Sequence, residues 1–135
     1  MRDQLEQDEE YANRLNYYLQ EDALMALEKG DKLLNTNNFE AAINQYKVAL
    51  AMDLKNDKIR QHIAQAYKRQ CILIGDECET AMIIYDFLID TYPLDIPLLK
   101  ERLELNEHIG DSIGIENDKS MIRKAQFKLN NGQPD

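Results

Sequence analysis

The sequence contains few residues that interrupt helices, few cysteines and a minority of basic residues. Its 5 glycines and 3 prolines in 135 residues are too few for the closely spaced turns of an all-β sandwich or barrel. Its 2 cysteines are too few for a disulfide scaffold, and no run approaches the roughly 18 apolar residues of a membrane span. The 16 Lys and Arg against 25 Asp and Glu disfavour a partner whose phosphates must be neutralised. We therefore expect no nucleic-acid partner and no membrane insertion.

What the chain does contain is an acidic, helix-forming composition whose charge is unevenly distributed. The formal net charge is −9. Residues 1–22 carry two bases against seven acids (−5), and residues 71–107 carry two bases against nine acids (−7). Residues 54–70 carry five bases against one acid (+4), and we call this segment the basic island. With 44% hydrophobic residues the chain can bury one core, so we expect a single acidic domain.

Apolar residues recur at helical spacing almost throughout, in segments rich in Ala, Leu, Glu, Lys and Gln. Short turn sequences with Asn, Gly, Asp or Pro separate these segments. The pattern predicts an all-α fold of stacked antiparallel helix hairpins, with helical regions near 3–35, 39–53, 57–74, 77–91, 96–109 and 113–130. It leaves open whether the first region is one helix or two joined near Glu21 and Asp22.

An internal repeat lies within these helices. Two stretches show a small residue, an aromatic residue one turn later and a further apolar residue: Ala42-x3-Tyr46-x2-Ala49 and Ala81-x3-Tyr85-x2-Leu88. The small residue lets the preceding helix approach closely, and the aromatic ring fills the space between neighbouring hairpins. We therefore expect these residues to be buried.

With Gly30 on the preceding helix, this pattern resembles the tetratricopeptide-repeat family, whose unit of about 34 residues is a helix pair. The resemblance implies a superhelix of three units near 23–56, 57–94 and 95–129, after an acidic N-terminal helical segment at 1–22. The remaining residues, 130–135, are predicted to be a disordered tail. The sequence departs from the family pattern in having no tryptophan and a second unit longer by about one turn.

The resemblance further implies a concave groove, lined by the first helix of each unit, that holds a segment of a protein or peptide partner. Most of the residues expected there lie on the helix of the basic island, and two lie on the first helix: Lys58, Gln61, His62, Gln65, Lys68, Arg69, Leu27 and Asp31. One hypothesis is that the island residues contact an acidic or backbone-rich partner segment. The alternative is that they pair within the chain with Glu101 or Glu104.

No catalytic constellation is recognisable. His62 and His108 lie in different predicted helices without a metal-binding or nucleophile motif, so we expect no enzyme, no metal site and no cofactor. Asp86 and Asp90 are one turn apart, but a solvated face is the simplest interpretation. Cys71 and Cys78 flank the Gly75 turn, so a disulfide is conceivable there. Without an export signal we expect reduced, mostly buried thiols and a cytoplasmic location.

The function predicted from these observations is an adaptor or scaffold that binds a partner without catalysis. The alternatives are a small acidic chaperone for secreted substrates, a self-associating scaffold or the regulatory subunit of an enzyme complex. The N-terminal segment is amphipathic, with Leu5, Ala12, Leu15 and Leu19 on one stripe. It is expected either to cap the first repeat or to cover the groove. A homodimer through a terminal helix is also possible.

Overall fold

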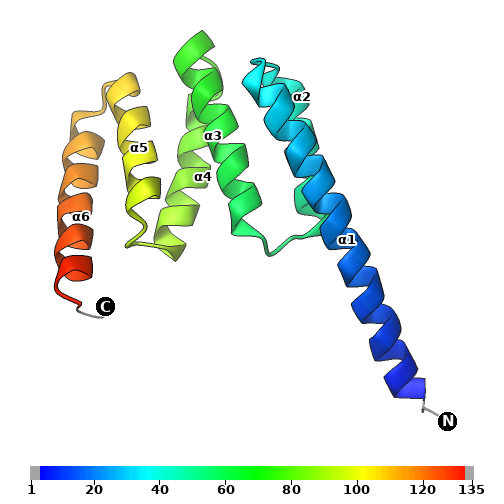
Figure 1. Cartoon of the computed structure of the whole chain (residues 1–135). Helices are drawn as coiled ribbons and strands as arrows, with labels where there is room; N and C mark the ends of the chain where they lie inside the picture. The colour runs from blue at the N-terminus through cyan, green and yellow to red at the C-terminus, as the bar shows by residue number, and fades with distance from the viewer. Residues whose placement is uncertain (1–3, 133–135) are drawn as a thin grey trace. The chain divides into compact units, whose positions relative to one another are not determined.

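The computed structural model describes residues 4–132, and within them the chain is all-α (Figure 1). Six helices follow one another along this part of the chain: α1 (Gln4–Asn35), α2 (Phe39–Met52), α3 (Asp57–Ile74), α4 (Cys78–Thr91), α5 (Ile96–Ile109) and α6 (Ser112–Asn130). Each boundary lies within one residue of its predicted position. The first region, whose continuity the sequence left open, is a single helix of 32 residues.

The turn residues explain where the helices begin and end. Asp95 and Asp111 precede α5 and α6, and each side chain accepts a hydrogen bond from a backbone N–H in the first turn at 3.1 Å. Gly110 ends α5 with a φ of 83°, a left-handed conformation that glycine adopts without steric cost. The sequence-based reading of these residues as turns is confirmed.

The chain divides into two compact units, which we describe separately. Unit 1 extends to Ile59 and unit 2 begins at Arg60. The division falls close to the predicted boundary between the first and second repeat units. The second and third predicted units share one hydrophobic core in unit 2, which includes residues of α3, α4, α5 and α6.

Unit 1 is the hairpin of α1 and α2. The side chain of Tyr46 is fully buried, and its ring occupies the place where a β-carbon on Gly30 would stand, 2.5 Å from the ring carbon Cε1. Only glycine allows the two helices to approach this closely. The Tyr46 hydroxyl donates a hydrogen bond to Asp31 Oδ1 at 2.6 Å. Asp31, predicted to line a groove, therefore holds the core tyrosine of this hairpin.

The repeated sequence positions are all buried, as predicted. Their exposed fractions are 0% or 1% in both units: Ala42, Tyr46 and Ala49 in α2, and Ala81, Tyr85 and Leu88 in α4. In unit 2 these α4 residues pack with apolar residues of α5, among them Leu98 and Leu99. The repeat therefore describes the packing of both units.

A disulfide bond joins Cys71 at the end of α3 to Cys78 at the start of α4. The expectation of two reduced thiols is wrong. Between the cysteines, Gly75 and Glu77 both have positive φ values, 73° and 65°. The tight turn brings the two cysteine Cα atoms to 4.8 Å, within the range of about 4.4–6.8 Å that a disulfide requires.

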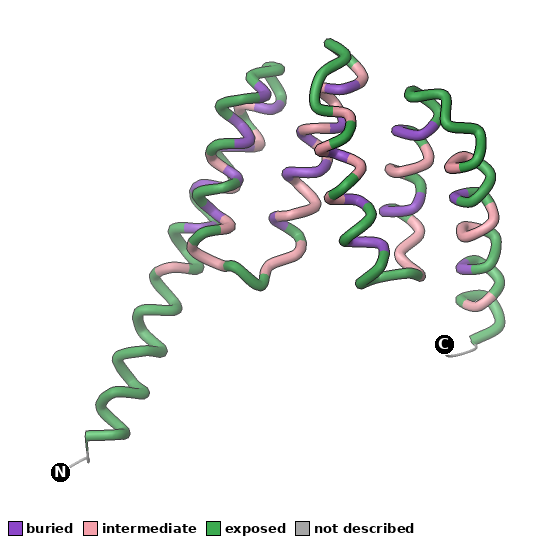
Figure 2. The backbone as a smooth tube through the Cα atoms, turned by 180° about the vertical axis from the view of Figure 1, so that it is seen from behind, coloured by how far each residue is buried: buried purple, intermediate pink, exposed green. Residues whose placement is uncertain are grey.

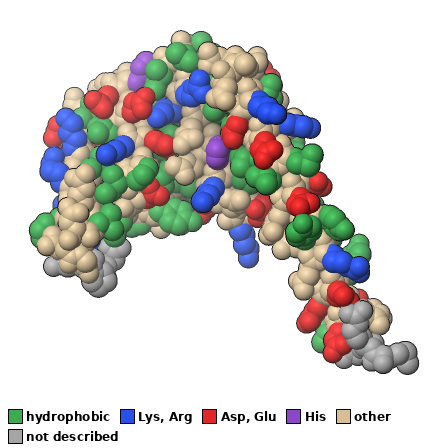
Figure 3. Space-filling view, in the orientation of Figure 1, with side chains coloured by type: hydrophobic (Ala, Val, Ile, Leu, Met, Phe, Trp, Pro, Cys, Tyr) green, Lys and Arg blue, Asp and Glu red, His purple; other side chains and the backbone are tan. Residues whose placement is uncertain are grey.

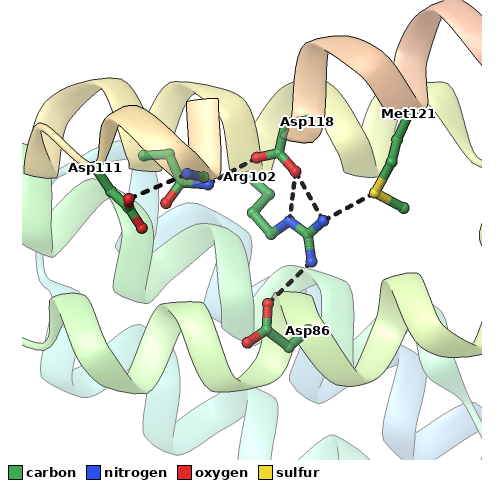
Figure 4. Close-up of polar contacts among 7 residues, drawn as sticks. Asp86, Arg102, Asp111, Asp118 and Met121 are labelled. Carbon is green, nitrogen blue, oxygen red and sulfur yellow. Dashed lines mark hydrogen bonds and ion pairs between the residues drawn. The ribbon is translucent and has the colours of Figure 1, made fainter. Parts of the chain in front are cut away.

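A polar network inside unit 2 joins α4, α5 and α6 (Figure 4). Asp118 of α6 is 1% exposed, and its carboxylate accepts hydrogen bonds from Arg102 Nε at 2.9 Å and Asn106 Nδ2 at 2.7 Å. Arg102 also contacts Asp118 through Nη2 at 2.7 Å and the exposed Asp86 through Nη1 at 3.0 Å. Asp86, interpreted from sequence as a solvated residue, is thus one partner of a largely buried arginine.

The two ends of the chain differ from the simplest expectations. Residues 4–22 belong to α1 and are exposed except for half-buried Leu19 (Figure 2), so within unit 1 they do not cap the hairpin. In the predicted tail, Asn130 still belongs to α6 and residues 131–132 form a turn, while 133–135 lie outside the described residues. No helix among residues 4–132 combines the length and hydropathy needed to cross a bilayer.

Candidate functional site

Within unit 2, polar side chains of α3 face polar side chains of α5. Gln65 Nε2 donates a hydrogen bond to Glu101 Oε1 at 2.6 Å. One turn further along both helices, Lys68 Nζ is 3.0 Å from Glu104 Oε2. The matching spacing of three residues on each helix aligns the two pairs. We call the surface formed by Gln65, Lys68, Glu101 and Glu104 the α3–α5 face.

The four side chains of the α3–α5 face differ in their exposure to solvent. The Lys68 side chain is 11% exposed, whereas that of Glu104 is 61% exposed. Gln65 and Glu101 are half-buried. A half-buried ion pair is screened less than a surface pair, so Lys68 is held to Glu104 more firmly than an exposed lysine would be.

Two buried polar atoms beneath this face lack hydrogen-bond partners among the described residues. They are the hydroxyl oxygen of Tyr85, on α4, and Oε2 of Glu101. Burial raises the pKa of Tyr85 above its usual value, and the negative charge of the nearby Glu101 raises that pKa further. Tyr85 therefore stays protonated at neutral pH. The protonated Tyr85 hydroxyl is a donor beside the Glu101 carboxylate, so the two buried groups can satisfy each other.

Three of the five bases of the basic island, Arg60, Lys68 and Arg69, are engaged in interactions, whereas Lys55 and Lys58 are exposed. Lys68 is paired with Glu104, and the Arg60 guanidinium stands over the ring of Phe87 at 5.8 Å from its centroid. Arg69 and His62 are half-buried and also engaged in interactions. For Lys68, the structure favours the alternative of pairing within the chain.

The remaining predicted groove residues have different surroundings. Gln61 is half-buried on α3, and Lys58 is exposed near the start of that helix, in unit 1. Leu27 is half-buried on α1, and Asp31 accepts the Tyr46 hydrogen bond. Within unit 2, the structure therefore brings Gln65 and Lys68 together with acidic residues of α5, whereas Leu27, Asp31 and Lys58 belong to unit 1.

Sequence reasoning treated Tyr85 as a core residue and overlooked its unsatisfied hydroxyl. The ring is in the core as predicted, but the hydroxyl lies near the α5 carboxylates. The aligned spacing of Gln65 and Lys68 with Glu101 and Glu104 was visible in the sequence. Among residues 4–132, no group of three or more His, Cys, Asp or Glu is placed to hold a metal ion.

Comparison with known proteins gives no match to a family model, to a curated protein or to a solved structure.

Proposed function

We propose that the chain is a protein-interaction module, an adaptor or scaffold without catalytic activity, that binds a partner segment along the α3–α5 face. The observation that carries the proposal is the excess of carboxylates at this face, where Glu101 and Glu104 of α5 meet a single lysine, Lys68. The Glu104 side chain is 61% exposed, so its carboxylate can accept a donor from a bound segment in addition to its bond from Lys68.

The charges of the face indicate what kind of segment fits. One lysine faces two carboxylates, Glu101 and Glu104, so the face has more acceptor than donor capacity. A segment rich in hydrogen-bond donors, such as an extended backbone with Lys or Arg side chains, suits it better than an acidic one. This reverses the charge expected from the basic island, because Lys68 is already neutralised by Glu104.

The resemblance to tetratricopeptide repeats is consistent with this proposal. Helical repeats bury one side of each hairpin against its neighbours and leave another side available for a partner. The buried Ala-x3-Tyr positions of α2 and α4 fit such packing.

Selection of random 12-residue peptides displayed on phage, with the full chain as target, tests the proposal. Selected peptides are then synthesised, and their affinities are measured by fluorescence anisotropy. Glu101→Gln keeps the shape of the side chain and removes its charge, so we expect about a tenfold or larger loss of affinity. The double variant Lys68→Met, Glu104→Gln removes both charges of the ion pair and should also weaken peptide binding.

The matched control is Lys119→Met with Glu116→Gln, an exposed pair of opposite charges three residues apart on α6. It should leave peptide affinity unchanged. Failure to select any peptide, or equal affinities for the wild type and Glu101→Gln, would contradict the proposal. Circular dichroism of each variant shows whether its helices are retained.

A further inference from the structure

Among the described residues of unit 1, no other helix covers the first half of α1. Residues 4–22, which we call the α1 extension, precede the part of α1 whose residues Ala23, Ala26, Gly30 and Leu34 are buried. Because α2 has only 14 residues against 32 in α1, the extension projects beyond its partner helix (Figure 1). All of its residues except half-buried Leu19 are exposed.

The apolar line of the extension continues the line that α2 covers. Leu5, Ala12 and Leu19 recur every seven residues, and the next step in this series is the buried Ala26. Seven residues are close to two helical turns, with a drift of about 20° per step. The extension therefore presents to solvent the same face that α1 buries against α2. Leu15 lies beside this line and is 47% exposed.

An isolated helix of this length is marginal in water, because nucleation is unfavourable and packing normally supplies most helical stability. The extension nevertheless leaves large side chains in solvent: Leu5 is 68% exposed and Tyr11 is 63% exposed. Tyrosines are enriched at protein interfaces, where the ring is covered and the hydroxyl stays wet. An occupant that packs as α2 does, along the same face, would bury this apolar line.

The charge of the extension selects among occupants. Residues 4–22 carry six acids against one arginine, a net charge of −5. Acidic and hydrophobic side chains lie side by side along it (Figure 3). Pairing with the same segment of a second copy would bring −5 against −5, and like charges across an interface oppose association. A helix with a basic rim gains instead from the opposite charges.

We propose that the α1 extension is a docking strip for an amphipathic helix of a partner protein, with an apolar stripe flanked by Lys and Arg. The partner helix continues the path of α2 along α1 over about 28 Å. Its apolar stripe covers Leu5, Ala12, Leu15 and Leu19, and its basic rim faces the acids of the extension. This surface lies on unit 1 and is independent of the α3–α5 face.

Two synthetic helical peptides of the same length test this proposal against the full chain. Both carry leucines at heptad a and d positions; one has lysines at the flanking positions and the other has glutamates. In fluorescence anisotropy the lysine peptide is expected to bind, more weakly at high salt, and the glutamate peptide is not. Leu5→Ser with Leu15→Ser should lower affinity for the lysine peptide at least tenfold.

The control is Ile113→Ser with Phe127→Ser, two exposed apolar residues of α6 that are 75% and 60% exposed. This variant should bind the lysine peptide like the wild type. The proposal is overturned if the two peptides bind equally, or if the Leu5 and Leu15 substitutions leave affinity unchanged. It is also overturned if light scattering shows a dimer that these two substitutions dissociate, because the strip would then be occupied by a second copy.

Discussion

Replacement of Asp118 by asparagine should destabilise unit 2 strongly, although the two side chains have nearly the same shape. The Asp118 side chain is 1% exposed and the Arg102 side chain 14% exposed, so the pair is largely shielded from water. The substitution leaves the guanidinium with Asp86 as its only carboxylate partner among the described residues, and Asp86 is 56% exposed. Removing one member of a buried ion pair costs about 3–5 kcal/mol. Because Asp86 remains, we expect the lower limit, about 3 kcal/mol.

Urea unfolding followed by circular dichroism at 222 nm measures this change. The dependence of the unfolding free energy on urea concentration is compared between the wild type and the variant, which shows whether the two proteins unfold in the same manner. Glu116→Gln is the control, because it removes an exposed carboxylate from the same helix and should change stability by no more than about 0.5 kcal/mol. If Asp118→Asn costs no more than this control, the buried network does not stabilise the packing of α6 on α5.

A double-mutant cycle then assigns the effect to the pair. Arg102→Gln alone leaves the Asp118 carboxylate buried with Asn106 as its remaining hydrogen-bond donor. If the two groups stabilise each other, the double variant costs less than the sum of the single variants, with a coupling of about 2 kcal/mol. Additive effects would show that the groups act independently.

Three further predictions concern the disulfide, the buried tyrosine and the close helix contact. Removing the disulfide by Cys71→Ala with Cys78→Ala should lower the free energy of unfolding by about 2 kcal/mol, as estimated from loop closure, and should abolish the effect of a reducing agent on the melting temperature. Burial raises the pKa of Tyr85 in the folded state. The contribution of Tyr85 to the free energy of unfolding is therefore fully present below the unfolded tyrosine pKa of about 10. Above that pH, the free energy of unfolding falls by up to about 1.4 kcal/mol per pH unit. Urea titrations from pH 9 upward should show this extra slope in the wild type but not in Tyr85→Phe. Gly30→Ala forces a β-carbon to 2.5 Å from the Tyr46 ring, and should destabilise unit 1 by about 1–3 kcal/mol in urea unfolding.

Each of these predictions has a result that contradicts it. Equal sensitivity of the wild type and the cysteine variant to reductant would exclude a stabilising disulfide. If the free energy of unfolding falls equally with pH above about pH 9 in the wild type and in Tyr85→Phe, the Tyr85 hydroxyl is not shielded from water. For the helix contact, Glu28→Ala is the control on an exposed side of α1. A Gly30→Ala variant as stable as this control would show that the hairpin has room for a methyl group.

The helices were predictable because their signals are local. Spacing of apolar residues and turn chemistry placed every boundary of α2 to α6 within one residue. The internal repeat also identified buried positions correctly, because the Ala and Tyr residues of the pattern are buried in both α2 and α4.

The features that sequence reasoning missed depend on contacts between distant residues or on redox conditions. Arg102 and Asp118 are separated by 16 residues, and periodicity does not show which polar side chains meet. A partial signal was present, since Asp118 lies on α6 between Ile115 and Ile122 at helical spacing. The disulfide depends on the turn geometry at Gly75 and on an oxidising environment. The cytoplasmic location stays a prediction, and the disulfide weighs against it.

The candidate site was predictable only in part, and the structure changes the charge that we expect of its partner. The pairing of the basic island with α5 was one of two interpretations, and the Lys68–Glu104 contact supports it. The surroundings of the Tyr85 hydroxyl could not be predicted. The repeat pattern indicates that the ring is buried but does not indicate which atoms surround the hydroxyl.

The net charge of −9 therefore has a different meaning once the pairs are known. Of the five bases of the basic island, Lys68 is paired with Glu104 within unit 2. The −5 of residues 4–22 lies on an exposed helix with an uncovered apolar line. Long-range attraction depends on the net charge of a segment that is accessible to solvent. The strongest electrostatic attraction for a partner is consequently expected at the α1 extension, and the partner is expected to be basic.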